Sequence, residues 1–175
     1  MEKLTQSPKH PVSAVLAGPY GHPFHPMLVT VPIGAWVASL VFDVASYVED
    51  RPAFLVQGSR WLIGLGVLGA LAAATVGFLD FLAIPAGTRA RRTAVLHLSL
   101  NLTITCAYAG NYTLRQNLTV DQHPTPVGPL VLSVLSIAAL TVSGYLGGKL
   151  AYRYGVRVAD EDTQADGYLA RHARD

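Results

Sequence analysis

Three histidines and one aspartate are the residues of this chain whose types and spacing could do chemistry. His22 and His25 lie in the run Gly-His-Pro-Phe-His-Pro, directly before an apolar stretch, and Asp80 and His97 lie on the two sides of a short connection between further apolar stretches. Imidazole nitrogens and carboxylate oxygens bind zinc, iron or manganese, and two imidazoles can bind a haem iron from opposite faces. These four residues are therefore candidates for a metal or haem site.

Four apolar stretches must position these residues. Each is close to the roughly 20 residues that a helix needs to cross a bilayer, and no strand-type alternation recurs along the chain. Short connections that contain proline and glycine make neighbouring helices antiparallel. The sequence predicts an all-α, polytopic membrane protein, an antiparallel four-helix transmembrane bundle, with spans at residues 27–47, 61–84, 94–112 and 127–148.

Composition excludes several classes of protein. The hydrophobic set makes up 51% of the 175 residues and only 14% are charged, which is too apolar for an ordinary soluble domain. The net charge is +2, and no basic run is interleaved with aromatic residues, so nucleic acid is not expected as a partner. The single cysteine, Cys106, excludes an intrachain disulfide and a cysteine-based metal cluster.

Lysine and arginine are distributed unequally between the two sides of the predicted bundle, and cytoplasmic segments retain positive charge. Both termini and the second loop are therefore expected to be cytoplasmic. Residues 1–26 would form a cytoplasmic segment with the His-Pro motif, 27–150 the transmembrane domain and 151–175 a polar cytoplasmic tail. Ten basic residues lie on the cytoplasmic side and three, Arg51, Arg60 and Arg115, on the other; the ten are Lys3, Lys9, Arg89, Arg91, Arg92, Lys149, Arg153, Arg157, Arg171 and Arg174.

The depth of the candidate residues in the bundle brings them to one level. A helix rises about 1.5 Å per residue, so Asp80, near the end of the second span, is level with His97, near the start of the third. His25 lies next to the start of the first span, where the helix dipole keeps an imidazole neutral and able to bind a metal. We expect His22, His25, Asp80 and His97 to converge at the cytoplasmic interface.

Three interpretations of this cluster stay open. Haem b could lie between His97 and either His25 or His22, in an electron-transfer subunit. A single Zn, Fe or Mn ion could be held by the histidines, with Asp80 as a ligand or as the partner that orients His97, in a metal-binding protein or enzyme. The same residues could also form a hydrogen-bonded cap without a cofactor, in a structural or assembly subunit. The haem-binding redox subunit is the hypothesis that we put first, and whether the chain is an enzyme stays open.

Other polar residues of the spans are expected to hold helices together, because polar groups facing lipid are costly. One face of the third span is polar, and it must point inward. Asp43 lies near the opposite membrane face and is interpreted as structural, with Arg60, Tyr108 or Tyr112 as its partner. Trp36 is predicted to lie in the core. The residues of the polar face are His97, Asn101, Thr105, Tyr108 and Tyr112.

Three runs of the sequence resemble the bacterial membrane proteins of domain-of-unknown-function family 2231: GHPFHPMLVTVPIGAWVASLVFD, GFLDFLAIPAGTRARRTAVLHLSLN and GGKLAYRYGV. The resemblance covers roughly residues 21–158 and implies a four-helix bacterial membrane protein, which we expect to lie in the cell inner membrane. Some members look fused to Rieske-type iron–sulfur domains, which favours a redox role. The expected partners are the lipid bilayer, a redox partner protein and a second copy of the chain.

The resemblance also carries residues over by position. Many relatives have a histidine where this chain has Tyr154, so a second haem is not expected here. Asn101 and Arg89 are implied as residues that support the site. The family-like positions are His22, Pro23, His25, Pro26, Asp80, Arg89, His97, Asn101, Gly147, Gly148, Tyr152 and Gly155.

Overall fold

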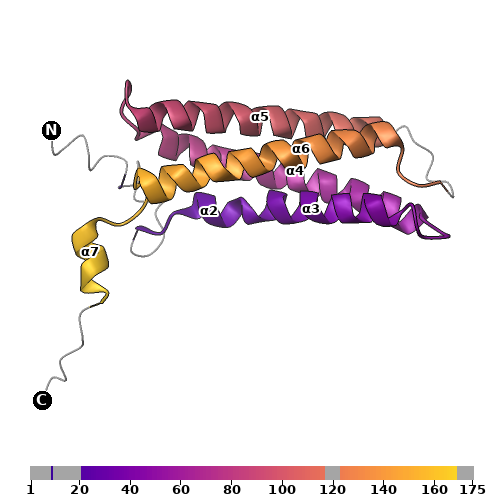
Figure 1. The fold of residues 1–175 in the computed structure, drawn as a ribbon, viewed down its shortest axis with the longest axis horizontal. Helices are drawn as coiled ribbons and strands as arrows, with labels where there is room; N and C mark the ends of the chain where they lie inside the picture. The colour runs from indigo at the N-terminus through magenta and orange to yellow at the C-terminus, as the bar shows by residue number, and fades with distance from the viewer. Residues whose placement is uncertain (1–8, 10–20, 117–122, 169–175) are drawn as a thin grey trace, which may run out of the picture.

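A computed structural model describes residues 9, 21–116 and 123–168 of the chain. Most of the predicted segment 1–26 lies outside the described residues, and so does the end of the predicted tail 151–175. The described residues form helices and no strand, as the sequence predicts for an all-α protein (Figure 1). The elements are α2 (Phe24–Leu28), α3 (Thr30–Ala45), α4 (Ala53–Leu82), α5 (Arg89–Gln116), α6 (Val127–Gly148), the π-helical turn η4 (Lys149–Arg153) and α7 (Glu161–Asp166).

Helices α2 and α3 form one nearly continuous helix. The amide of Val29 donates to the carbonyl of His25 at 3.1 Å, and the amide of Ile33 donates to the carbonyl of Val29 at 3.2 Å. Pro32 has no amide hydrogen to donate to the carbonyl one turn before it, which separates α2 from α3. The helix begins at Phe24, three residues before the predicted start of the first span, so His25 lies in its first turn.

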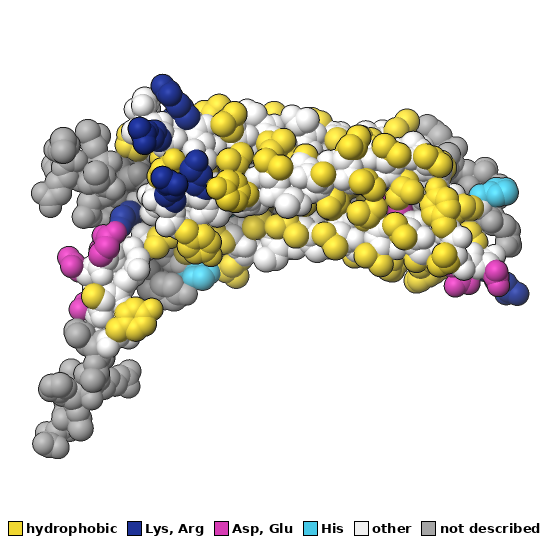
Figure 2. All heavy atoms as spheres, viewed as in Figure 1, with side chains coloured by type: hydrophobic (Ala, Val, Ile, Leu, Met, Phe, Trp, Pro, Cys, Tyr) yellow, Lys and Arg dark blue, Asp and Glu magenta, His cyan; other side chains and the backbone are white. Residues whose placement is uncertain are grey.

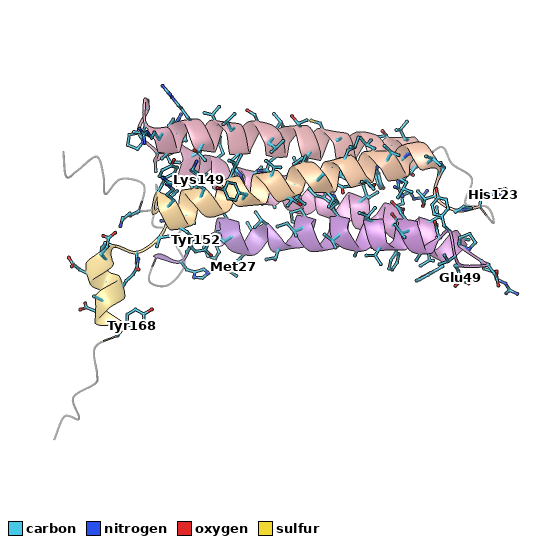
Figure 3. All side chains as sticks on the ribbon, in the orientation of Figure 1. Met27, Glu49, His123, Lys149, Tyr152 and Tyr168 are labelled. Carbon is cyan, nitrogen blue, oxygen red and sulfur yellow. The ribbon has the colours of Figure 1, made fainter. Side chains whose placement is uncertain are left out.

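The long helices lie side by side and alternate in direction (Figure 1). Helix α3 packs against α4, α4 against α5, α5 against α6, and α6 against α3. Met27 and Lys149 lie at one end of the molecule, here called the Lys149 end, and Glu49 and His123 at the other, here called the Glu49 end (Figure 3). Two antiparallel hairpins, α3–α4 and α5–α6, therefore face each other.

Three segments are long and apolar enough to cross a membrane: Phe24–Ala45, Ala53–Leu82 and Val127–Arg153. Helix α5 has 28 residues but does not meet this criterion, since it is more polar than the others. The predicted count of four spans is thus supported for three. Apolar side chains cover the visible long sides of the molecule, and Lys and Arg gather at the Lys149 end (Figure 2).

The centre of the bundle is aromatic and aliphatic. Trp36, 2% exposed, stacks on Tyr108 with ring centroids 4.2 Å apart, and Ile63 and Ile104 complete the cluster. Gly66 lies so close to the Trp36 indole that a β-carbon would overlap it. The prediction of Trp36 as a core residue is confirmed.

A buried ion pair joins the helices near the Glu49 end. The two terminal guanidinium nitrogens of Arg115 donate to the two carboxylate oxygens of Asp43 at 2.7 Å each. Arg115 also donates to the Asn111 side-chain oxygen at 2.9 Å and to the Ser59 hydroxyl at 3.0 Å, and the Thr125 hydroxyl donates to Asp43 at 2.9 Å. Asp43 is 0% and Arg115 3% exposed. The network connects α3, α4 and α5 with the segment that precedes α6.

Asp43 pairs with Arg115, and not with Arg60, Tyr108 or Tyr112 as the sequence predicted. Helix α5 continues to Gln116, one turn beyond its predicted end at residue 112. That extra turn carries Arg115 along the inward face of α5, where it reaches Asp43. The interpretation of Asp43 as a structural residue is consistent with this network.

Candidate functional site

His25 is held against α4 by its Nδ1 atom, which lies 2.9 Å from the carbonyl oxygen of Ala73. A carbonyl only accepts, so Nδ1 carries the hydrogen and Nε2 keeps a lone pair. A β-carbon on Gly77 would lie 2.7 Å from the His25 ring, so glycine at this position lets the imidazole pack on the helix. Among the described residues, none hydrogen-bonds to Nε2 of His25.

His97 is held in the same way against α6. Its Nδ1 atom lies 2.9 Å from the carbonyl oxygen and 3.1 Å from the hydroxyl of Ser143. Asn101, one turn along α5, donates its side-chain amide to the His97 carbonyl at 2.8 Å, and the same amide nitrogen lies 3.2 Å from Nε2 of the ring. A β-carbon on Gly147 would lie 3.1 Å from this ring. Asn101 and Ser143 together fix the ring and leave its lone pair on Nε2.

The two imidazoles contact each other edge to face between the hairpins. Their ring centroids are 6.4 Å apart and their planes are inclined by 82°. Two imidazole nitrogens that bind one metal ion from opposite sides, each at about 2.0–2.1 Å, place their ring centres roughly 6 Å apart. The centroid spacing of His25 and His97 leaves room for one ion, and it is equally that of an ordinary edge-to-face ring contact.

A cavity of about 340 Å³ contains both rings, which is within the size range of small-molecule sites. Its wall is mostly apolar, and small residues of α4, among them Ala70, Ala74 and Gly77, leave the space open. Leu71 and Leu102 line it as well, although they are 54% and 63% exposed. The cavity therefore extends to the outer, apolar surface between α4 and α5. Its polar and charged lining residues are His25, Asp80, His97, Asn101, Thr105 and Arg157.

Asp80 is paired with Arg157, a residue that the sequence did not single out for the site. The Nε atom of Arg157 lies 3.0 Å from one carboxylate oxygen of Asp80, and the two side chains are 7% and 18% exposed. Arg157 has a positive φ of 59°. Asp80 thus lines the cavity but is paired with the segment after α6, and not with His97 as expected.

The four predicted ligands do not come together. Pro23 is extended and precedes α2, so His22 lies before the helix, with its Nε2 atom 3.0 Å from the sulfur of Met27. Neither His22 nor Arg89 lines the cavity. Within residues 9, 21–116 and 123–168, no group of three or more His, Cys, Asp or Glu side chains is arranged to hold a metal. Of the predicted set, His25 and His97 form a pair.

An apolar outer surface and three helices long and apolar enough to cross a membrane are typical of a helical membrane protein. The chain belongs to the family described as predicted membrane protein (DUF2231), which it matches over residues 21–160. The family resemblance of the sequence is thereby confirmed, and the matched region contains every residue of the cavity. No curated protein and no solved structure matches the chain.

Proposed function

We propose that this protein is a membrane electron-transfer subunit that holds one haem b between His25 and His97. The observation that carries the proposal is the pair itself: two imidazoles on opposite hairpins, 6.4 Å apart, each with Nδ1 bonded to a main-chain carbonyl. Such a bond on Nδ1 fixes the tautomer and makes Nε2 a better ligand. Two histidines from facing helices are a common way to hold haem in a helical bundle.

The surroundings of the pair fit a flat, largely apolar cofactor. His25 and His97 would hold the haem iron, and the apolar residues that line the cavity would contact the rest of the cofactor. His97 would bind through Nε2, which lies 3.2 Å from the Asn101 amide nitrogen, and Asn101 would stay anchored by its 2.8 Å bond to the His97 carbonyl. The haem would supply a one-electron couple, and the apolar wall would exclude water and disfavour the more highly charged ferric state.

We infer that α5 also crosses the membrane, which completes an antiparallel four-helix transmembrane bundle. Its length is comparable to that of α4, and it runs antiparallel beside α4 and α6 (Figure 1). Part of its polar character comes from inward groups, among them Asn111 and Arg115, which are buried, while Leu96 and Leu102 are exposed. An inward polar face with an outward apolar face is what a bundle in lipid requires.

The same proposal places the Lys149 end in the cytoplasm and the protein in the cell inner membrane. Arg115 and Arg157 are both buried in ion pairs. Among the described residues, this leaves two basic residues at the Glu49 end, Arg51 and Arg60, and six at the other end: Lys9, Arg89, Arg91, Arg92, Lys149 and Arg153. The charge asymmetry of the sequence therefore persists when the buried pairs are left out. It follows the positive-inside rule with both termini cytoplasmic.

The test is an absorption spectrum of the detergent-purified chain, oxidised and reduced, together with elemental analysis. We expect a Soret band that shifts on reduction and one iron per chain. His25→Ala and His97→Ala should each abolish the shifted band, whereas His22→Ala, whose ring lies beside Met27, should keep it. Equal loss in all three variants would contradict the proposed pair.

Two other outcomes correspond to the remaining candidate functions. If the protein contains stoichiometric zinc, iron or manganese but shows no Soret band, the ligand is a bare metal ion. A metal-binding protein or enzyme would then be the better assignment. Protein that carries neither would leave a structural or assembly subunit in which His25 and His97 only hydrogen-bond to neighbouring helices.

A further inference from the structure

We propose that Arg157 binds a carboxylate of the ligand in this cavity, and that on the haem assignment this group is a propionate. The inference rests on the proposed function, because it concerns the same cavity. It adds a residue that neither the histidine motif nor the polar face of α5 identifies. Three features support it: the backbone conformation at Arg157, the burial and hydrogen bonding of its side chain, and its position relative to the two histidines.

Arg157 lies in an irregular segment that follows α6. The π-helical turn η4 is closed by a bond from the amide of Tyr154 to the carbonyl of Lys149 at 3.2 Å. Gly155 and Arg157 then take positive φ angles of 66° and 59°. Among the described residues, Arg157 is the only non-glycine with a positive φ, a conformation that is unfavourable for a long side chain.

Packing holds this turn in place. Leu150 is buried against Ile84, which follows the end of α4, and Ala94, which lies near the start of α5, and Val156 packs on the same cluster. The amide of Val156 donates to the carbonyl of Leu150 at 3.0 Å. These contacts stabilise the unfavourable backbone conformation of Arg157. Strained residues that are held in this way are often found at binding sites.

The side chain of Arg157 is buried and incompletely bonded. It is 7% exposed, and its Nε atom is buried without a hydrogen-bond partner in the described part of the chain, although a carboxylate oxygen of Asp80 lies 3.0 Å away. One terminal nitrogen donates to the carbonyl of Gly21 at 3.3 Å. A guanidinium has five donors in a planar fork that matches a carboxylate, so the partners among residues 9, 21–116 and 123–168 leave donors for a second acceptor.

The position of Arg157 in the cavity indicates what kind of ligand it serves. It lines the cavity at the Lys149 end, beyond His25 and His97, while the rest of the wall is mostly apolar. A ligand that fits must be apolar over most of its surface and carry an acidic group on one edge. Haem b has this chemistry, since its two propionates lie on one edge of the ring. Asp80 would then balance Arg157 when no carboxylate is bound.

The experiment compares haem b with its dimethyl ester, in which both propionates are uncharged. Each compound is titrated into the full-length protein, purified in detergent from cells that cannot synthesise haem and are given none, and the shift of the Soret band reports binding. We expect the wild-type chain to bind the free acid about tenfold or more tightly, as a buried charge-assisted bond provides. The preference should fall to near one in Arg157→Gln and remain in Arg153→Gln, which changes an exposed arginine at the same end.

Each outcome separates the inference from the function on which it rests. If the wild-type chain binds both compounds equally well, or if Arg157→Gln keeps the preference, the carboxylate role of Arg157 is wrong while the histidine pair stands. If the wild-type chain shifts the Soret band of neither compound, the haem assignment itself is wrong. The ester comparison on the wild-type chain needs no substitution, so a variant that fails to fold does not weaken the test.

Discussion

Replacing Asp43 by asparagine tests the buried network at the Glu49 end. The Asp43 carboxylate accepts two bonds from Arg115 at 2.7 Å each and one from Thr125 at 2.9 Å, and it is fully buried. In Asp43→Asn, an NH2 group replaces one carboxylate oxygen, so two N–H donors point at each other where Arg115 had an acceptor. The positive charge of Arg115 then stays buried without a negative partner. Removing one partner of a buried ion pair costs about 3–5 kcal/mol. We expect a loss of this size in the free energy of unfolding.

The assay is denaturant-induced unfolding of the detergent-solubilised protein, followed by circular dichroism, with Glu49→Gln as the matched control. Glu49 is an exposed acid at the same end, so its neutralisation should change the unfolding free energy by less than about 0.5 kcal/mol. The double variant Asp43→Asn/Arg115→Met should be less destabilised than the sum of the two single variants, because no unpaired charge remains. A loss below about 1 kcal/mol in Asp43→Asn would refute the reasoning.

Two further predictions concern the site and the orientation. Gly77→Ala adds a β-carbon 2.7 Å from the His25 ring and should weaken haem binding about tenfold or more, whereas Gly144→Ala, which meets nothing within 4 Å, should leave the Soret titration unchanged; equal effects would contradict the packing of His25. With Cys106 replaced by serine, cysteines at Ala86 and Asp50 should differ in intact cells: a membrane-impermeant maleimide should label position 50 only, and labelling at position 86 alone would reverse the proposed orientation.

Much of the fold could be predicted because it depends on local pattern. Long apolar stretches can satisfy their main chain in lipid only as helices, and proline and glycine mark the connections between them. The polar face of α5 repeats at helical spacing, so its inward direction follows from the cost of exposing it to lipid. Trp36 and Tyr108, both buried, confirm that the inward faces of α3 and α5 were correctly predicted.

The pairing of His25 with His97 follows from depth, whereas other contacts depend on packing between distant segments. Arg115, the partner of Asp43, is 72 residues away in the sequence. It reaches Asp43 because α5 is one turn longer than the apolar stretch, and a hydropathy average does not show this extra turn. His22 differs from His25 because the backbone at Pro23 is extended and the helix starts only at Phe24. Arg157 enters the cavity through two positive φ angles, and nothing in its immediate sequence except Gly155 signals such a turn.

The electron paramagnetic resonance spectrum of the oxidised protein at low temperature tests the central claim most directly. Two imidazoles on one ferric haem give a low-spin signal, and ring planes inclined by 82° give its strongly anisotropic form with one dominant low-field feature. We predict this signal for the wild-type chain and its loss in His25→Ala and in His97→Ala. A wild-type protein without haem, or with a high-spin signal from iron bound by one histidine, would contradict the account.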